Sequence, residues 1–202
     1  MPDNFPITLR MDLPDSPGPQ SLPERILGGE GTGSAEYAAE LLTAPGALMQ
    51  LSLVEARVVV GYMHPKQIDA GVTFIREGDA KHNDFMLLLL EGDVTVENMA
   101  VRKAEPVTIS VQGPGSLIGE VGLLDAAPRS ASCTANSSVR CAVLTREALE
   151  RLIDDQPRIS AKFLLAVSAR VAARLRETSK KLKLYSRLAS TMQQEIDQLH
   201  GP

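Results

Sequence analysis

The sequence predicts an α+β protein: an antiparallel β jelly roll with flanking short helices, followed by a long C-terminal dimerisation helix. Three observations lead to this fold class. The middle of the chain holds many short apolar and β-branched stretches, separated at nearly regular spacing by Gly, Pro, Asp and Asn. Only residues 119–125 interrupt this pattern, as one short helical turn. After Pro157 no Gly or Pro occurs before residue 201, and apolar residues recur every three or four positions.

The composition is that of a folded chain with an aliphatic core. Apolar residues make up 44% of the 202 residues, aromatic residues only 3%, and Trp is absent. The net charge of −4 gives no general attraction for nucleic acid. The charge is uneven, however: residues 1–155 hold 12 Lys and Arg against 22 Asp and Glu, and residues 156–202 hold 9 against 3. Residues 156–202 are therefore basic, although the protein as a whole is acidic.

Neither the cysteines nor the N-terminus indicates secretion. Cys133 and Cys141 are too few for a disulfide framework or a four-cysteine zinc site, and we expect them to be buried in neighbouring strands. The first residues show no basic flank followed by an apolar run, so we expect no signal peptide. The longest apolar run, residues 85–90, is far shorter than a membrane span. We expect a cytoplasmic protein without a metal site or a membrane partner.

The chain is expected to divide into three parts. They are a flexible N-terminal arm, a β domain that begins with helices, and a long helix, over residues 1–33, 34–155 and 156–202. The arm is rich in Pro, Gly and acidic residues, with Ile26 and Leu27 able to hold its middle. Ser34 can cap a short helix that ends near Pro45, and a second short helix is expected over 47–56.

Seven strands are expected between residues 57 and 145. They cover residues 58–63, 71–75, 85–90, 93–97, 107–111, 130–135 and 139–144. A short helix over 146–153 follows the last strand, and Pro157 suits the first turn of the long helix. That helix would run to about residue 199 and be ~60 Å long.

The long helix carries a heptad repeat, which is typical of a two-stranded coiled coil. Its positions are Leu164, Ser168, Val171, Leu175, Thr178, Leu182, Tyr185, Ala189, Met192, Ile196 and Leu199. The alternative is a helix that lies along its own domain, because Ile159 and Phe163 form a second apolar stripe near its start. We expect both: the first turns pack on the sheet, and the later turns form a parallel homodimer. Ser168 and Thr178 are polar residues at heptad positions that face the partner helix. Polar residues there reduce the stability of the coiled coil, so we expect a functional role for them.

Residues 119–132, G-E-V-G-L-L-D-A-A-P-R-S-A-S, combine groups suited to a cyclic phosphate. Unpaired backbone N–H groups at a helix start attract an anion, and Gly119 and Gly122 let the backbone approach closely. Arg129 adds a permanent charge with forked donor geometry, and Ser130 adds a hydroxyl donor.

Glu120 supplies the carboxylate of this segment, which suits a ribose hydroxyl rather than a phosphate. A plain salt bridge between Glu120 and Arg129 is the structural alternative. An enzyme with Glu120 and Asp125 as acid–base groups is a weaker one, because no nucleophile–base pair accompanies them. We therefore expect no catalytic residue.

The same segment resembles the phosphate-binding cassette of the cyclic-nucleotide-binding domain. That domain is shared by the catabolite activator (cyclic AMP receptor) proteins, the regulatory subunits of protein kinase A and cyclic-nucleotide-gated channels. Residues 74–79 and 89–96 match the turn glycines and strands of the family, and the resemblance covers about residues 50–183. One departure is Ile118, where many members have an aromatic residue.

The resemblance implies roles for individual residues. It assigns Glu120 to the ribose 2′-hydroxyl, Arg129 to the equatorial phosphate oxygen and Ser130 to the phosphate. Three further residues would supply backbone contacts and shape: Gly119, Val121 and Gly122. Two apolar side chains are weaker candidates for walls around the base: Val96 and Ile109.

Residues 168–181 are similar to the dimer helix of the catabolite activator family. There a Thr–Ser pair, one residue from each subunit, reaches the adenine amino group, which implies this role for Thr178 and Ser179. Arg174 falls where the family has an arginine near the cyclic phosphate, and we expect it to pair with Glu120. The Thr–Ser pair favours cyclic AMP, and cyclic GMP remains an alternative because a hydroxyl such as that of Ser130 can bind a guanine amino group.

The resemblance does not extend to DNA binding. Only 22 residues follow Lys180, too few for a helix-turn-helix with its core. We expect a regulator that passes a cyclic-nucleotide signal through the dimer coil to a protein partner. Two weaker alternatives remain. One is a basic helix that binds DNA directly. The other is a domain that is purely structural or docks a protein, or that senses another ligand such as haem or a cyclic dinucleotide. For haem, the histidines are scattered: His64, His82 and His200.

Overall fold

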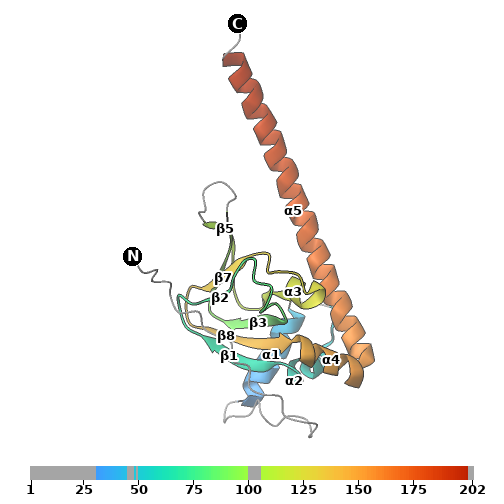
Figure 1. The fold of residues 1–202 in the computed structure, drawn as a ribbon. Helices are drawn as coiled ribbons and strands as arrows, with labels where there is room; N and C mark the ends of the chain where they lie inside the picture. The colour runs from blue at the N-terminus through green and yellow to red at the C-terminus, as the bar shows by residue number, and fades with distance from the viewer. Residues whose placement is uncertain (1–30, 45–47, 49, 100–105, 200–202) are drawn as a thin grey trace.

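A computed structural model of the chain describes residues 31–44, 48, 50–99 and 106–199. Two antiparallel sheets form the body, helices lie against it, and one long helix rises past it (Figure 1). The helices and strands are, in chain order, α1 Gly31–Thr43, α2 Leu53–Gly61, β1 His64–Ile68, β2 Thr73–Ile75, β3 Phe85–Glu91, β4 Val94–Met99, β5 Pro106–Gln112, β6 Leu117–Ile118, α3 Glu120–Asp125, β7 Ser132–Ala135, β8 Val139–Thr145, α4 Arg146–Asp155 and α5 Pro157–Leu199. The expected arm, with Ile26 and Leu27, lies almost wholly outside the described residues.

The two sheets have four strands each, in the orders β1-β8-β3-β6 and β2-β7-β4-β5. Every pairing between neighbouring strands is antiparallel. This is the α+β jelly-roll class that the sequence predicts, with flanking short helices and a long C-terminal helix. Strands β7 and β8 follow each other in sequence but lie in opposite sheets, so Cys133 and Cys141 are both buried without being neighbours in one sheet.

Strand β3 explains why its sequence is an unbroken apolar run. Successive side chains of a strand point to opposite faces. Phe85, Leu87 and Leu89 therefore pack between the two sheets. The side chains between them, Met86, Leu88 and Leu90, pack in a second cluster on the other face of the strand, where the helices lie. A strand buried on both faces needs apolar residues at every position.

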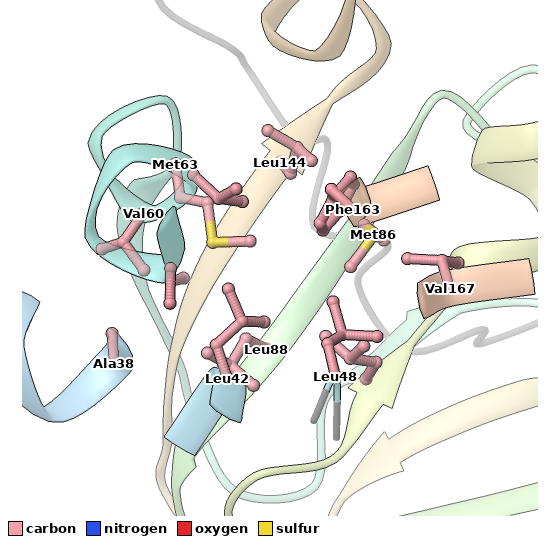
Figure 2. Packing of buried hydrophobic residues seen from close by; sticks show 14 of the residues in the cluster. Ala38, Leu42, Leu48, Val60, Met63, Met86, Leu88, Leu144, Phe163 and Val167 are labelled. Atoms are coloured by element: carbon pink, nitrogen blue, oxygen red, sulfur yellow. The ribbon is translucent and has the colours of Figure 1, made fainter. Parts of the chain in front are cut away.

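The first turns of α5 belong to this second cluster. Phe163 and Val167 are almost fully buried, and Figure 2 places them beside Met86. Residues of α1 and α2, such as Leu42 and Val60, join the same cluster. The start of the long helix is therefore fixed to the body, as the second apolar stripe predicted.

One expected strand is wrong. Residues 58–63 lie mostly in helix α2, which begins at Leu53. The β-branched run V-V-V favoured a strand, but Ser52 and Glu55 form a capping box in which the Ser52 hydroxyl accepts from the Glu55 N–H and the Glu55 carboxylate accepts from the Ser52 N–H. This cap starts the helix, and Ala56, Val59 and Val60 form its buried side.

Two strands were not predicted, and one helix begins earlier than expected. Strand β1, H-P-K-Q-I, contains Pro65 and polar residues, which is acceptable because β1 is an edge strand. Strand β6 has only two residues. Helix α1 begins at Gly31 rather than after Ser34. Among the described residues, no helix combines the length and apolarity needed to cross a membrane.

Candidate functional site

The candidate site begins where β6 ends and the short helix α3 starts. Gly119, the residue before α3, has a φ of 83°, a left-handed conformation that favours glycine. Glu120 is therefore the first residue of α3, and its side chain turns into the protein, with 2% exposure. The helix ends at Asp125, and the next residue, Ala126, also has a positive φ of 56°. The structure confirms the short helical turn that the sequence predicts at residues 119–125.

Arg129 is buried among backbone carbonyl groups. Its Nε donates to the carbonyl of His82 at 3.1 Å, Nη1 to that of Gly119 at 2.9 Å and Nη2 to that of Phe85 at 2.9 Å. The guanidinium also lies 4.4 Å from the centre of the Phe85 ring. Burial lowers the pKa of Arg129 from its usual value, partly offset by nearby acidic groups such as Asp84. Arg129 therefore ties the segment after α3 to β3 and to the loop before it.

The two glycines of the segment leave room for this arginine. A Cβ at Gly119 would lie 2.7 Å from Arg129 Nη1 and 3.1 Å from the Phe85 carbonyl oxygen. A Cβ at Gly122 would lie 3.0 Å from the same Nη1 and 3.1 Å from the carbonyl oxygen of Asn83. Both glycines are thus needed for the close packing of α3 against Arg129 and β3.

Glu120 pairs with the long helix rather than with Arg129. Its Oε1 accepts a hydrogen bond from Arg174 Nη1 at 2.6 Å. This confirms the expected pairing of Arg174 with Glu120, and the plain salt bridge between Glu120 and Arg129 is not formed. A buried carboxylate needs a charged partner, so this contact holds α3 beside α5.

Arg170 is a member of the site that the sequence interpretation missed. It lies one turn before Arg174 and is half-buried. Burial lowers the pKa of Arg170, the charge of Glu120 opposes this shift, and the neighbouring Arg174 adds to it. Two cations of α5 therefore lie near one buried carboxylate, and Arg174 is hydrogen-bonded to it. The i, i+4 spacing of the two arginines was the available signal.

Two other missed residues hold the cassette in shape. Asn83 Nδ2 donates to the carbonyl groups of Ala126 and Ala127, at 2.6 and 3.0 Å. Arg146 Nη2 donates to the carbonyl of Gly122 at 3.0 Å. Side chains from the loop before β3 and from α4 thus satisfy carbonyl groups at the end of α3.

The remaining predicted residues lie on the segment around α3 and on α5. Ser130 is exposed and Val121 is half-buried. Thr178 and Ser179 are exposed on α5, one turn beyond Arg174, and the Thr178 hydroxyl donates to the Arg174 carbonyl at 3.0 Å.

The two candidates for apolar walls around the base are placed differently. Val96 is buried between the two sheets, in the same cluster as Cys133. The side chain of Ile109 lies outside the described part of the chain. Within the described residues, no three His, Cys, Asp or Glu side chains gather as a metal site would require.

Three comparisons identify the class of this domain. Residues 65–156 match the family of the cyclic nucleotide-binding domain. A relative from Mycobacterium tuberculosis, the "CRP-like cAMP-activated global transcriptional regulator", is 29% identical over 143 residues, which is 71% of this chain and 61% of that protein.

Two solved structures are similar to the chain as well. A cyclic nucleotide-binding domain from Methylobacillus flagellatus has a TM-score of 0.66 at 28% identity, over 79% of this chain and 93% of that one. The catabolite activator protein of Thermus thermophilus has a TM-score of 0.59 at 29% identity, over 67% of this chain and 61% of that one.

Residues 65–156 therefore match a cyclic nucleotide-binding domain, and the chain is similar to CRP-like regulators. The family match includes the site residues from Asn83 to Arg146 and ends before Arg170 and Arg174 of α5. The chain spans about 61% of the length of the M. tuberculosis relative.

Proposed function

We propose that this protein is a regulatory cyclic AMP sensor rather than an enzyme. Cyclic AMP binds beside α3, its base reaches α5, and a parallel homodimer of α5 passes the change to a protein partner in the cytoplasm. The observation that carries this proposal is the contact between Glu120 and Arg174, because it joins the nucleotide-binding segment to the long helix at a single buried carboxylate.

Glu120 has the chemistry and the position for a ribose hydroxyl. A carboxylate can accept from a hydroxyl and from a guanidinium at the same time, since its two oxygens offer about four acceptor positions. The contact with Arg174 uses Oε1 of this carboxylate. Arg174 lies one turn before Thr178, so a ligand on Glu120 has the base-contacting candidates Thr178 and Ser179 within a turn of the helix.

Arg129 can bind a phosphate without leaving its present position. A guanidinium has five N–H donors. The bonds to the carbonyl groups of His82, Gly119 and Phe85 use one N–H on each of its three nitrogens. One N–H on Nη1 and one on Nη2 are left for an anion. Ser130, the next residue, is exposed and can donate its hydroxyl to the same phosphate.

The dimer part of the proposal rests on the exposed seam of α5. Leu175, Leu182, Tyr185 and Met192 are all heptad positions, and each is more than 60% exposed. A row of large apolar side chains on an isolated helix is stabilised by a second copy that covers it. Thr178 lies in the same row, so a base held there would contact both helices.

The proposal is tested by calorimetric titration of the protein with cyclic AMP and then cyclic GMP. Thr178→Ala should weaken cyclic AMP binding about tenfold, the size of one lost hydrogen bond to a buried ligand. Thr191→Ala is a matched control, because Thr191 is also exposed on α5 and donates to the carbonyl four residues earlier, at 3.1 Å. We expect it to bind like the original protein.

Three outcomes distinguish the alternatives. If cyclic GMP binds more tightly than cyclic AMP, and Ser130→Ala abolishes this binding, the protein is a sensor of cyclic GMP instead of cyclic AMP. Equal effects of Thr178→Ala and Thr191→Ala on cyclic AMP affinity would show that the base does not contact Thr178 of α5. No heat with either nucleotide, from protein that unfolds cooperatively, would contradict the proposed function and favour a docking module.

A further inference from the structure

A second stripe runs along α5, one residue before each position of the dimer seam. Its first members, Phe163 and Val167, are buried against the body. Its middle members are Arg170 and Arg174, and Arg174 donates to Glu120. The stripe continues through charged residues and then becomes apolar again: Glu177, Lys181, Leu184 and Leu188. The side of α5 that contacts the body thus carries two leucines beyond the nucleotide-binding residues.

These two leucines are not explained by the dimer. With Leu182 and Tyr185 at heptad positions a and d, Leu184 falls at position c and Leu188 at position g. A two-stranded coil buries positions a and d, while c faces solvent and g lies at the flank. Leu184 is 56% exposed and Leu188 51% exposed. They lie one turn apart on one face, so they form a continuous apolar spot.

The surroundings of the spot are uniformly basic. Four cations lie on the same two turns of α5: Lys180, Lys181, Lys183 and Arg187. All four are exposed. No Asp or Glu occurs anywhere from residue 178 to residue 194, although the chain as a whole has more acidic than basic residues. The leucines and the cations together are called the leucine–lysine surface below.

We propose that the leucine–lysine surface docks an acidic amphipathic helix of a partner protein. This inference rests on the proposed function, for which it names the chemistry of the partner and the place where it binds. Charge complementarity selects an acidic partner. A second dimer docked here through the same surface would place its four cations against these four, and the like charges would repel. Nucleic acid would match the charges but would leave the two leucines without an apolar contact.

The size of the surface limits the affinity. A helix in a groove is held by apolar side chains spaced three and four residues apart, with charged residues at the rim. Two leucines one turn apart offer a small contact area, so the dissociation constant should be on the order of 10 µM. Each copy in a dimer carries one such surface, which gives two docking sites beside the coil. The first leucine lies six residues beyond Thr178, about 9 Å along the helix, so the base-binding position and the docking position share one rigid element.

The test uses the full chain and a fluorescent 18-residue helical peptide with Leu at positions i, i+3, i+4 and i+7 and Glu at most other positions. Fluorescence anisotropy should show binding, and a peptide with Lys in place of Glu should bind at least tenfold more weakly. Leu184→Ala together with Leu188→Ala should weaken binding of the acidic peptide at least tenfold. Alanine keeps the helix intact. Leu165→Ala is the matched control, because Leu165 is 69% exposed on the same helix but outside both stripes.

The charge of the surface is tested separately. Lys181→Glu with Arg187→Glu should reverse the preference between the two peptides. The inference is overturned if the acidic peptide does not bind, if the leucine substitutions have no more effect than Leu165→Ala, or if both peptides bind equally. Binding of duplex DNA that depends on the lysines and not on the leucines would also overturn it. All peptide titrations are made first without nucleotide. The docking of the peptide is therefore tested independently of whether the protein binds cyclic AMP.

Discussion

Glu120 Oε1 and Arg174 Nη1 lie 2.6 Å apart, although 54 residues separate them and they belong to α3 and α5. The carboxylate is almost fully buried, whereas the arginine side chain is half-exposed. This contact is an ion pair between the short helix α3 and the long helix α5. Any ligand that changes the surroundings of Glu120 therefore acts directly on α5.

The first prediction concerns the two arginines that face Glu120. Replacing Arg174 with Gln should cost only about 1 kcal/mol of unfolding free energy, because Arg170 still supplies a positive charge near the carboxylate. Replacing both should cost about 3–4 kcal/mol, since a buried carboxylate without a partner charge is strongly destabilising. Urea denaturation of the single and double variants measures this, with the exposed Arg176→Gln as control. Simple additivity of the two substitutions would contradict a shared role.

The second prediction concerns Arg129 as a structural residue. Arg129→Ala should lower the unfolding free energy by about 3–5 kcal/mol, because the carbonyl groups of His82, Gly119 and Phe85 lose their donor inside the protein. Arg129→Lys should also destabilise, since one ammonium group cannot reach three separated carbonyl groups. Ser130→Ala, at the exposed neighbouring residue, should change stability by less than about 0.5 kcal/mol. Chemical denaturation gives the three values.

The expected loss of stability affects the interpretation of any binding experiment with an Arg129 variant. A loss of cyclic AMP binding in Arg129→Ala would not by itself identify a phosphate contact, because the segment around α3 would be disturbed as well. An Arg129→Ala variant as stable as the original protein would contradict the structural role that its three bonds indicate.

The third prediction compares two glycines with the same backbone conformation. Gly119 and Gly71 have φ values of 83° and 81°. Gly71→Ala should cost about 1–2 kcal/mol from backbone strain alone, because a Cβ there meets nothing within 4 Å. Gly119→Ala should cost at least about 2 kcal/mol more, because its Cβ would lie 2.7 Å from Arg129 Nη1. Equal losses in thermal or urea unfolding would show that Arg129 moves aside freely.

The fourth prediction concerns the two thiols. Burial raises the pKa of Cys133 and of Cys141 to about 12, from an ordinary value of 9.0. Both thiols are therefore neutral in the folded protein at pH 8, and a thiol reagent such as DTNB should react with them only after denaturation. Because the folded state keeps protons that the unfolded state releases above pH 9, the free energy of unfolding should fall as the pH rises from about 9 towards 12. Rapid labelling of native protein at pH 8 would contradict this.

The fifth prediction concerns the dimer seam. Leu182 is 68% exposed in the isolated chain, so Leu182→Asp should leave the unfolding of the β domain unchanged. The same substitution should convert a dimer to a monomer, because a carboxylate at a seam position has no partner in the coil. Sedimentation equilibrium measures the mass. Leu165→Asp, on an exposed residue outside the seam, should remain dimeric. A chain that is monomeric before any substitution would contradict the parallel homodimer.

The sequence predicted best where one physical signal acted alone. The absence of Gly and Pro after Pro157 marked α5, which the structure extends to Leu199. The apolar run of β3 marked a buried strand. The prediction for the segment around α2 was wrong because two signals competed. The β-branched residues favoured a strand, and the cap at Ser52 and Glu55 favoured a helix. The cap and the apolar contacts of α2 outweighed the strand preference of its valines.

The site was predictable in its residue types but not in its contacts. Glu120, Gly119 and Arg129 stand out by their chemistry and spacing. The sequence alone does not reveal that Arg129 reaches three carbonyl groups, since those bonds depend on how β3 and the preceding loop lie beside α3. Arg170 was missed for a similar reason: its spacing from Arg174 is visible in the sequence, but only the packing of α5 brings it near the charge of Glu120.

The length of α5 turns a small local movement into a large distant one. The helix has 43 residues, and its anchor in the core is Phe163, near one end. From Phe163 to Leu199 the helix extends about 54 Å. A tilt of about 5° at the anchor therefore displaces the far end by about 5 Å, the length of one helical turn. Because the segment around α3 contacts α5 near this anchored end, a change there would be amplified along the helix.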